Sequence, residues 1–358
     1  MKKLLLGVSG AVSFLVFLVL GLVSNHMIDC QLDQQMAERW SEKKDVAQVS
    51  CFFSSDAAIK EDTFKEFEHA LDAALKEASI TLESENPGAR LYVDAYSADG
   101  KITLTNGKTN LTADAIGIGG DFFLFHPLKL INGSFFSGND LMQDHCVIDQ
   151  DAAWQLFGSN DVVGQTVYIG KVPHMITGVV ERQQGRMAEA AGLDSTVVYV
   201  SYKTLSELGS NHGINHYEII MPSPVTGYAY NYVKDNIRVD EKEVDVIDNT
   251  SRYSLLSRLK MIGQFGTRSM NGKAIIYPYW ENIARGYEDV IAVFTLFMIL
   301  FLLYPVILLV VIFVHWWRHK GWTLKDVWNR MKDKLERSME RWREKKQNQK
   351  LKQKENDL

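Results

Sequence analysis

The run Val290–Val314, VIAVFTLFMILFLLYPVILLVVIFV, is 25 residues long and contains no charged residue. A helix of roughly 20 apolar residues crosses the hydrocarbon layer of a bilayer, so this run is long enough to span a membrane. Pro305 lies inside it, which membrane-spanning helices tolerate. Leu4–Val23 is a second uncharged run, of 20 residues, close to the N-terminus. Together the two runs predict a protein that crosses the membrane twice.

Basic and aromatic residues at the ends of these runs predict their orientation. Lys2 and Lys3 precede the first run, and the sequence HWWRHK, His315–Lys320, follows the second. Because basic flanks remain on the cytoplasmic side, we expect both termini in the cytoplasm. A cleaved signal peptide is the alternative for the first run, but the run is long for one and Leu22–Ser24 is a poor cleavage site. The expected parts are a first membrane segment at 1–24, an extracytoplasmic domain at 25–289, a second membrane helix at 290–314 and a cytoplasmic tail at 315–358.

Charge is divided unevenly between these parts. The whole chain has a net charge of −5, whereas residues 315–358 carry +7 and Lys2 and Lys3 add +2, which leaves the middle near −14. An acidic middle beside a basic tail indicates two compartments. The acidic surface is either simply solvated or a docking face that steers a cationic peptide or partner toward it, and the sequence does not choose between them.

The outer part contains two segments with a strand-helix-strand pattern. In the first, 46–53 and 90–96 are expected strands around a helix at 61–79, with a capping box from Thr63 to Glu66. In the second, 216–221 and 243–248 are expected strands around a helix at 225–237. Such units usually place their two strands side by side and parallel. We expect an α+β domain whose α/β layer joins both units, with residues of about 130–210 inserted as a mostly β subdomain. Residues 31–44 are expected to extend the first membrane helix outward as a stalk.

Five short stretches carry a family resemblance. They are Gly120–Phe123, Leu130–Phe136, Ile148–Gly158, Val163–Gly170 and Ile176–Val180. In this order they are similar to the MacB-like periplasmic core domain of bacterial ABC transporter permeases. The resemblance implies a porter-like α/β layer with a separate small β lobe, in the plasma membrane of a bacterium.

Two departures from that family pattern affect the expectation. Ser134 stands where the family usually has arginine. The resemblance also implies four membrane spans, three of them after the core domain, whereas one apolar run follows it here. We therefore expect a reduced form that lacks the C-terminal multi-span bundle.

Motifs for chemistry are few, and we expect no enzyme activity, no cofactor and no metal. The segment from Gly266 to Ala274 has the wrong spacing for a phosphate-binding loop. His212 and His216 are four residues apart but beside Gly213 and Asn215, so ordinary loop histidines are the favoured interpretation over a metal pair. The three cysteines are an odd number, and Cys30 with Cys51 either close a disulfide or remain thiols.

The tail predicts an interface. Apolar residues recur every three or four positions among basic ones, which is typical of an amphipathic helix in the membrane interface. The same stripe could instead dock on a partner subunit. The residues expected to form this interface are Trp316, Trp317, Trp322, Trp328, Met331, Leu335 and Trp342, with Lys325 and Arg330.

These expectations lead to two functions. The first is an accessory or half-size permease subunit of a MacB-like ABC system, which couples a separate cytoplasmic ATPase to the outer domain and works with a multi-span permease or as an oligomer. The second is a membrane-anchored binding, sensor or scaffold protein without transport activity. An extracytoplasmic enzyme is a third class without a supporting motif, and no nucleic-acid partner is expected.

Overall fold

A computed structural model describes residues 2–41, 45–81, 89–265, 275–320, 328–329 and 331–342. The chain divides into two compact units: residues 18–298, and residues 1–17 with those from 299 onward. Among the described residues the labelled helices are α1 (Lys2–Asp29), α2 (Met36–Trp40), α3 (Glu61–Glu77), α4 (Phe122–Phe125), α5 (Gln150–Phe157), α6 (Arg186–Ala190), α7 (Tyr202–Leu208), α8 (Tyr228–Asn236), α9 (Leu255–Gly263) and α10 (Tyr279–His319), with short 3-10 turns at Leu32–Gln34 and Ser55–Ala57. Residues 331–342 are also helical.

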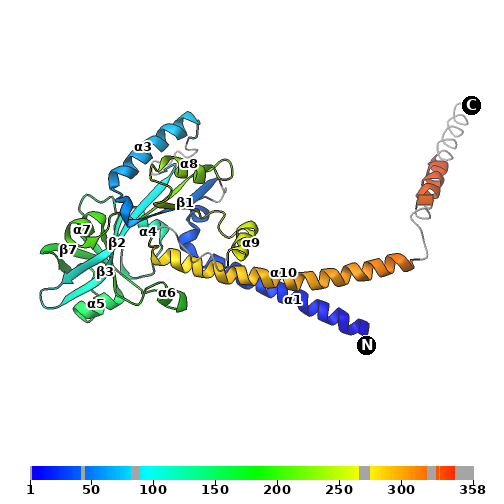
Figure 1. Cartoon of the computed structure of the whole chain (residues 1–358), viewed down its shortest axis with the longest axis horizontal. Helices are drawn as coiled ribbons and strands as arrows, with labels where there is room; N and C mark the ends of the chain where they lie inside the picture. The colour runs from blue at the N-terminus through cyan, green and yellow to red at the C-terminus, as the bar shows by residue number, and fades with distance from the viewer. Residues whose placement is uncertain are drawn as a thin grey trace, which may run out of the picture. The chain divides into compact units, whose positions relative to one another are not determined.

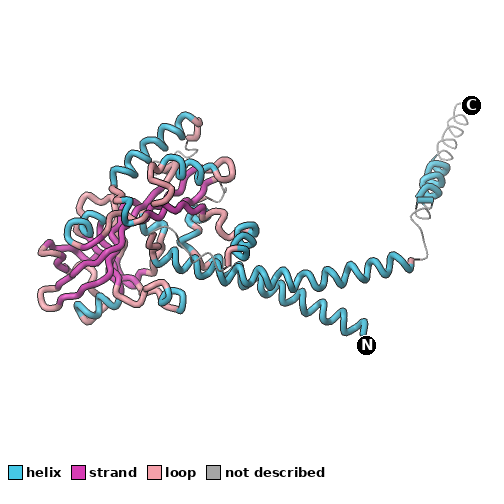
Figure 2. Tube along the Cα trace, in the orientation of Figure 1, coloured by secondary structure: helices cyan, strands magenta, loops and turns pink. Residues whose placement is uncertain are grey.

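The strands of the described residues form one mixed sheet of 11 strands, magenta in Figure 2. They are β1 (Val46–Phe53), β2 (Val93–Thr105), β3 (Asn110–Gly120), β4 (Leu130–Gly133), β5 (His145–Asp149), β6 (Thr166–Ile169), β7 (Val172–Val180), β8 (Val197–Ser201), β9 (Ser210–Asn211), β10 (His216–Pro222) and β11 (Val244–Asp248). The main path runs β11-β1-β10-β2-β3-β8-β5-β7-β4. The α+β class is therefore confirmed.

The two strand-helix-strand units are interleaved, which corrects the expected pairing. β1 lies between β10 and β11, and β10 lies between β1 and β2, with every pairing antiparallel. The two strands of each unit are thus parallel but separated by a strand of the other unit, as in a split β-α-β fold. The prediction of adjacent parallel strands was wrong because each helix crosses over a strand that the other unit supplies.

Helices α3 and α8 cover one face of this interleaved half (Figure 1). The apolar side of α3 places Phe64, Phe67, Leu71 and Leu75 in the core, as its helical periodicity predicts. Phe64 stacks on Tyr217 with 4.4 Å between ring centroids. The expected capping box is absent from this helix, since its N-cap is Lys60 and makes no side-chain cap.

The second half of the sheet extends from the long β2–β3 hairpin. Sequence patterns did not identify this hairpin, which runs in register from Ala95–Gly120 to Thr105–Asn110. Strand β8 then pairs parallel with β3, and β5 and β7 continue outward. An apolar core that includes Ile102, Ile148, Val198 and Leu205 fills this half. The insert therefore shares the sheet with the α/β layer.

The expected stalk after α1 is broken into short turns. α1 ends at Asp29, a 3-10 turn covers Leu32–Gln34, and α2 begins at Met36. The side chain of Gln48 explains the break, because its Oε1 accepts from the Met36 N–H at 2.9 Å and its Nε2 donates to the Asp33 carbonyl at 2.7 Å. The prediction of one continuous helix over 31–44 was wrong, since a buried side chain of β1 replaces the helical hydrogen bonds.

Within the unit formed by residues 1–17 and 299 onward, the two apolar helices contact each other through serines. The Ser13 hydroxyl donates to the Phe301 carbonyl at 2.8 Å, and Ser9 Oγ lies 2.7 Å from the Tyr304 hydroxyl. Pro305 has no N–H, so the Phe301 carbonyl loses the helical partner four residues later, and Ser13 supplies a replacement. α1 and α10 are both long and apolar enough to cross a membrane.

Candidate functional site

Arg252 is the centre of a buried ion network at the base of α10. It lies just after β11 and is 5% exposed. Its Nη1 and Nη2 donate to the two Glu281 carboxylate oxygens at 2.7 and 2.9 Å, and its Nε donates to Glu288 Oε1 at 2.5 Å. Gln34 accepts from Nη1 at 3.0 Å. Such a forked guanidinium-carboxylate contact fixes both direction and distance, so one side chain holds two turns of α10 against the segment after the sheet.

Arg285 extends this network toward solvent. Its Nε lies 2.6 Å from Glu281 Oε1, and its Nη2 lies 3.3 Å from Asp245 in β11. The guanidinium also stacks over the ring of Tyr277, 3.6 Å from its centroid. The hydroxyl of Tyr277 in turn donates to Asp245 at 2.8 Å. α10 is therefore attached to the edge strand β11 as well.

A chain of hydrogen bonds leads from Arg252 into the middle of the sheet. Arg252 Nη1 donates to Asn249 Oδ1 at 3.4 Å, and Asn249 Nδ2 donates to Ser50 Oγ at 2.7 Å. The Ser50 hydroxyl then donates to Glu218 Oε1 at 2.6 Å. Glu218 is in β10 and is fully buried. Polar contacts thus continue from α10 across β1 to β10.

Glu218 lies between two buried histidines. His126 Nε2 is 3.0 Å from Glu218 Oε2, and His216 Nε2 is 3.5 Å from Oε1. The other ring nitrogen of His126 lies 2.9 Å from Asp33 Oδ1, and that of His216 lies 3.1 Å from Ser97 Oγ. We call His126, His216 and Glu218 the histidine cluster.

Trp280, at the start of α10, covers the histidine cluster. Its ring centroid is 4.2 Å from that of His126 and 4.9 Å from that of His216. The indole is 1% exposed. The cluster is therefore shielded from solvent by the same helix that carries Glu281 and Glu288.

Electrostatics stabilise opposite charges inside the cluster. Burial alone lowers the pKa of His126, but the adjacent carboxylates of Glu218 and Asp33 outweigh burial and raise this pKa to about 9. Burial likewise raises the pKa of Glu218, yet the nearby His126 and His216 lower it well below its usual range. Charges removed from water need such partners, since an unpaired buried charge is strongly unfavourable.

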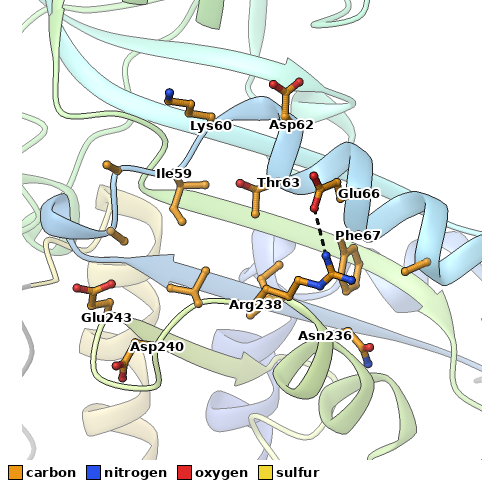
Figure 3. A pocket seen from close by; sticks show the side chains of 15 residues that line it. Ile59, Lys60, Asp62, Thr63, Glu66, Phe67, Asn236, Arg238, Asp240 and Glu243 are labelled. Atoms are coloured by element: carbon orange, nitrogen blue, oxygen red, sulfur yellow. Dashed lines mark hydrogen bonds and ion pairs between the residues drawn. The ribbon is translucent and has the colours of Figure 1, made fainter.

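A second candidate site is a cleft beside α3 that is open to solvent (Figure 3). It has a volume of about 420 Å³ and lies between the start of α3 and the segment between α8 and β11. Arg238 reaches across it, and its Nη1 lies 3.2 Å from Glu66 Oε2. Charged groups line it, namely Lys60, Asp62, Glu66, Arg238, Asp240 and Glu243.

The structure places the predicted tail residues only in part. Residues 331–342 are helical. Of the predicted interface residues, those that the structure describes are all exposed: Trp316, Trp317, Trp328, Met331, Leu335 and Trp342. Trp322, Lys325 and Arg330 lie outside the described residues, as does the segment 266–274. Nothing in the structure brings the tail residues to a defined partner, so the lipid or partner interface remains a prediction.

Sequence reasoning missed the buried network. His216 lies in β10, as the expected strand 216–221 places it, but its interpretation with His212 as an ordinary loop histidine was wrong, because it is fully buried beside Glu218. The sequence did hold one signal for this network. Glu281 and Glu288 are acidic residues seven positions apart just before the apolar run, so a helix places both side chains on one face, where they can share a buried cation. Cys30, Cys51 and Cys146 are free thiols, which answers the disulfide question for Cys30 and Cys51.

Comparison with known proteins identifies the family of this domain. The sequence profile described as the MacB-like periplasmic core domain matches residues 30–242, more than half of the chain. The chain belongs to this family. Its MacB-like domain therefore lies outside the cytoplasm of a membrane protein, and the expected resemblance is confirmed.

Relatives match this MacB-like chain over a limited stretch. The macrolide export ATP-binding/permease protein MacB of Neisseria gonorrhoeae is 32% identical over 105 residues, which are 29% of this chain and 16% of that protein. The MacB protein of Chromobacterium violaceum is 32% identical over 110 residues, with the same coverage. The chain thus spans about a sixth of the length of these relatives.

Solved structures include two similar outer domains. The periplasmic region of MacB from Actinobacillus actinomycetemcomitans is 18% identical, with a TM-score of 0.38, and the match covers 57% of this chain and 90% of that one. The extracellular domain of the noncanonic ABC-type transporter YknZ from Gram-positive bacteria is 17% identical, with a TM-score of 0.36, and covers 56% and 99%.

Proposed function

We propose that this MacB-like chain is an accessory or half-size permease subunit of an ABC transport system. In this proposal a separate cytoplasmic ATPase moves the membrane helices, and those helices move the outer domain. Both termini are cytoplasmic, residues 25–289 are outside, and the chain itself hydrolyses no ATP. The family membership supports the permease assignment, and the two helices long enough to cross a membrane fit the topology.

The observation that carries the proposal is the attachment of α10 to the sheet through Arg252. Mechanical coupling requires a stiff connection between a membrane helix and the domain it moves. Arg252 contacts Glu281 and Glu288, which lie in the first and third turns of a helix of 41 residues. Because all three side chains are at most 5% exposed, water does not compete for these contacts. A displacement at the base of α10 is thus passed to the sheet.

The tail is proposed to complete this coupling on the cytoplasmic side. Its exposed apolar and basic residues would bind anionic lipid, a partner subunit, or both. An ATPase or a multi-span permease is the expected partner, and the assembled system is expected to be oligomeric. This part rests on the sequence pattern of Trp328 to Trp342 and on the helix at 331–342.

A pulldown from native membranes tests the proposal. The tagged full chain is extracted in mild detergent, and co-purifying proteins are identified by mass spectrometry. Stoichiometric recovery of an ABC ATPase is expected, and a variant with Trp328, Met331, Leu335 and Trp342 changed to serine should lose it if the tail docks on that partner. Recovery of no ATPase, under conditions that keep a known ABC complex intact, would contradict the transporter assignment.

The cleft of Figure 3 favours a second function, a membrane-anchored binding or sensor protein. Four carboxylates against two cations line the cleft, which suits a cationic peptide or envelope component. Titration of the full chain with a lysine-rich peptide, monitored by calorimetry, should give salt-sensitive binding that Asp240→Asn with Glu243→Gln weakens. Absence of heat at low ionic strength would remove this alternative.

A further inference from the structure

The ligand-type atoms of the histidine cluster lie close to one another. His126, His216 and Glu218 each offer one atom, and these atoms all lie within 4.8 Å of one another. The two histidine-to-carboxylate distances are 3.0 and 3.5 Å. Zn²⁺ is bound at about 2.0–2.1 Å by tetrahedral nitrogen and oxygen ligands, which sets ligand atoms roughly 3.3 Å apart. The distance from His126 Nε2 to Glu218 Oε2, 3.0 Å, and that from His216 Nε2 to Oε1, 3.5 Å, are both near this value, so small side-chain shifts would bring the three groups onto one ion.

The same atoms lack hydrogen-bond partners among the described residues. His126 Nε2, His216 Nε2 and Glu218 Oε2 are buried and none makes an aligned hydrogen bond. Buried polar atoms are normally satisfied, and each exception calls for a cause. In the metal-free protein these atoms are held by charge, with His126 Nε2 3.0 Å from Glu218 Oε2. A bound cation would take the place of the proton on His126 and would satisfy all three atoms together.

The groups behind the cluster match the outer shell of a metal site. Metal-binding histidines usually give their second ring nitrogen to a carboxylate or another oxygen, which fixes the tautomer. Here the second nitrogen of His126 contacts Asp33, and that of His216 contacts Ser97. The Ser50 hydroxyl donates to Glu218 Oε1, so the carboxylate is also held in place.

We propose that His126, His216 and Glu218 bind a divalent metal ion of the zinc class, with the fourth position taken by water. Imidazole nitrogen and carboxylate oxygen suit Zn²⁺. All three residues are buried, so the ion would lie inside the domain.

Such an ion would join the elements that meet beneath α10. His126 follows α4, while His216 and Glu218 are in β10. Trp280 of α10 packs on both rings, and Asp33 in the turn after α1 contacts His126. Occupancy would therefore stiffen the junction from which α10 departs, independently of any transport partner.

Metal analysis of the purified full chain tests this site. The protein carries a tag other than polyhistidine, is stripped with a chelator in detergent, and is re-equilibrated with Zn²⁺. We expect about one zinc per chain by mass spectrometry, as for a single structural site. Co²⁺ in place of Zn²⁺ should give the visible absorption of a tetrahedral ion. Less than a tenth of an equivalent of zinc together with no cobalt band would overturn the proposal.

Matched histidine variants locate the ion. H126Q and H216Q should lose at least about tenfold in zinc affinity. H174Q is the control, because His174 is equally buried but hydrogen-bonded to Val172 and Thr204 elsewhere. Equal zinc binding by all four proteins would overturn the assignment.

Two further variants distinguish loss of a metal ligand from loss of the fold. H216C keeps a metal ligand, so its cobalt complex should gain a thiolate-to-metal charge-transfer band; a cobalt spectrum without that band would exclude His216 as a ligand. Asp33→Asn acts through His126 and should lower zinc affinity about 10- to 100-fold while the thermal unfolding of the stripped protein stays cooperative. Unchanged affinity in that variant would contradict the proposed outer shell.

Discussion

The junction at Arg252 and the cleft at Arg238 contain the same ion pair in opposite surroundings. Arg252 and Glu281 are 2.7 Å apart with side chains 3% and 1% exposed, whereas Arg238 and Glu66 are 3.2 Å apart and 75% and 69% exposed. Water and salt screen the second pair, so it contributes about 0–1 kcal/mol. The first pair is not screened, and its partners depend on each other. Burial, not distance, decides which arginine holds the structure together.

Arg252→Ala should have the largest effect on this comparison. It leaves Glu281 and Glu288 buried without their shared cation, which costs about 3–5 kcal/mol of unfolding free energy. Thermal melts of the full chain in detergent, followed by tryptophan fluorescence, measure the loss. The triple variant R252M/E281L/E288M removes all three charges and should regain most of that loss. A melting temperature of R252A within error of the wild type would show that the network is solvated after all.

Glu68 is half-buried, between the burial of Arg252 and the exposure of Arg238, and it makes stability depend on pH. Partial burial, followed by the charge and hydrogen bond of Asp94, raises the pKa of Glu68 from its usual 4.5 to about 8. The folded chain thus binds more protons than the unfolded chain between these values, so stability falls as pH rises from about 4.5 to 8.

The matching variant for this effect is Glu68→Gln, which cannot ionise. Wild-type melting temperature should fall more steeply between pH 5 and pH 8.5 than that of the variant. The difference between the two slopes isolates Glu68 from the other titrating groups. Parallel slopes would mean that Glu68 is already ionised at pH 5.

Arg238→Ala should have the smallest effect. It removes an exposed ion pair worth at most about 1 kcal/mol. Arg238 has a φ of 54°, a left-handed conformation that costs most side chains energy, so Arg238→Asn should be neutral or slightly stabilising. The melting temperatures of both variants are compared with that of R252A. If Arg238→Ala lowers the melting temperature as much as R252A does, burial does not decide the strength of these two ion pairs.

Local patterns in the sequence predicted the elements better than their assembly. The periodicity of Phe64, Phe67, Leu71 and Leu75 is enough to predict α3, because a helix repeats its buried face every three to four residues. The length of the two apolar runs likewise predicted helices α1 and α10. The interleaving of β10 between β1 and β2 leaves no such local trace, since it depends on which distant strands pair.

The polar network was hidden for a related reason. His126, His216 and Arg252 are single polar residues far apart in the chain, and each is unremarkable beside its sequence neighbours. Their meeting point exists only once β1 and β10 are paired and Trp280 of α10 packs on the two histidine rings. Only the spacing of Glu281 and Glu288 on one helical face carried a local signal.

The hydroxyl of Ser13 has a consequence for how α1 and α10 can move past each other. It donates to the one carbonyl, Phe301, that Pro305 deprives of its helical partner. A helix advances 1.5 Å per residue, so a piston-like slide of one helix by even a single residue would separate donor from acceptor. The exposed carbonyl would then have no partner in hydrocarbon. The hydrogen bond of Ser13 therefore opposes axial sliding of one helix along the other at this level.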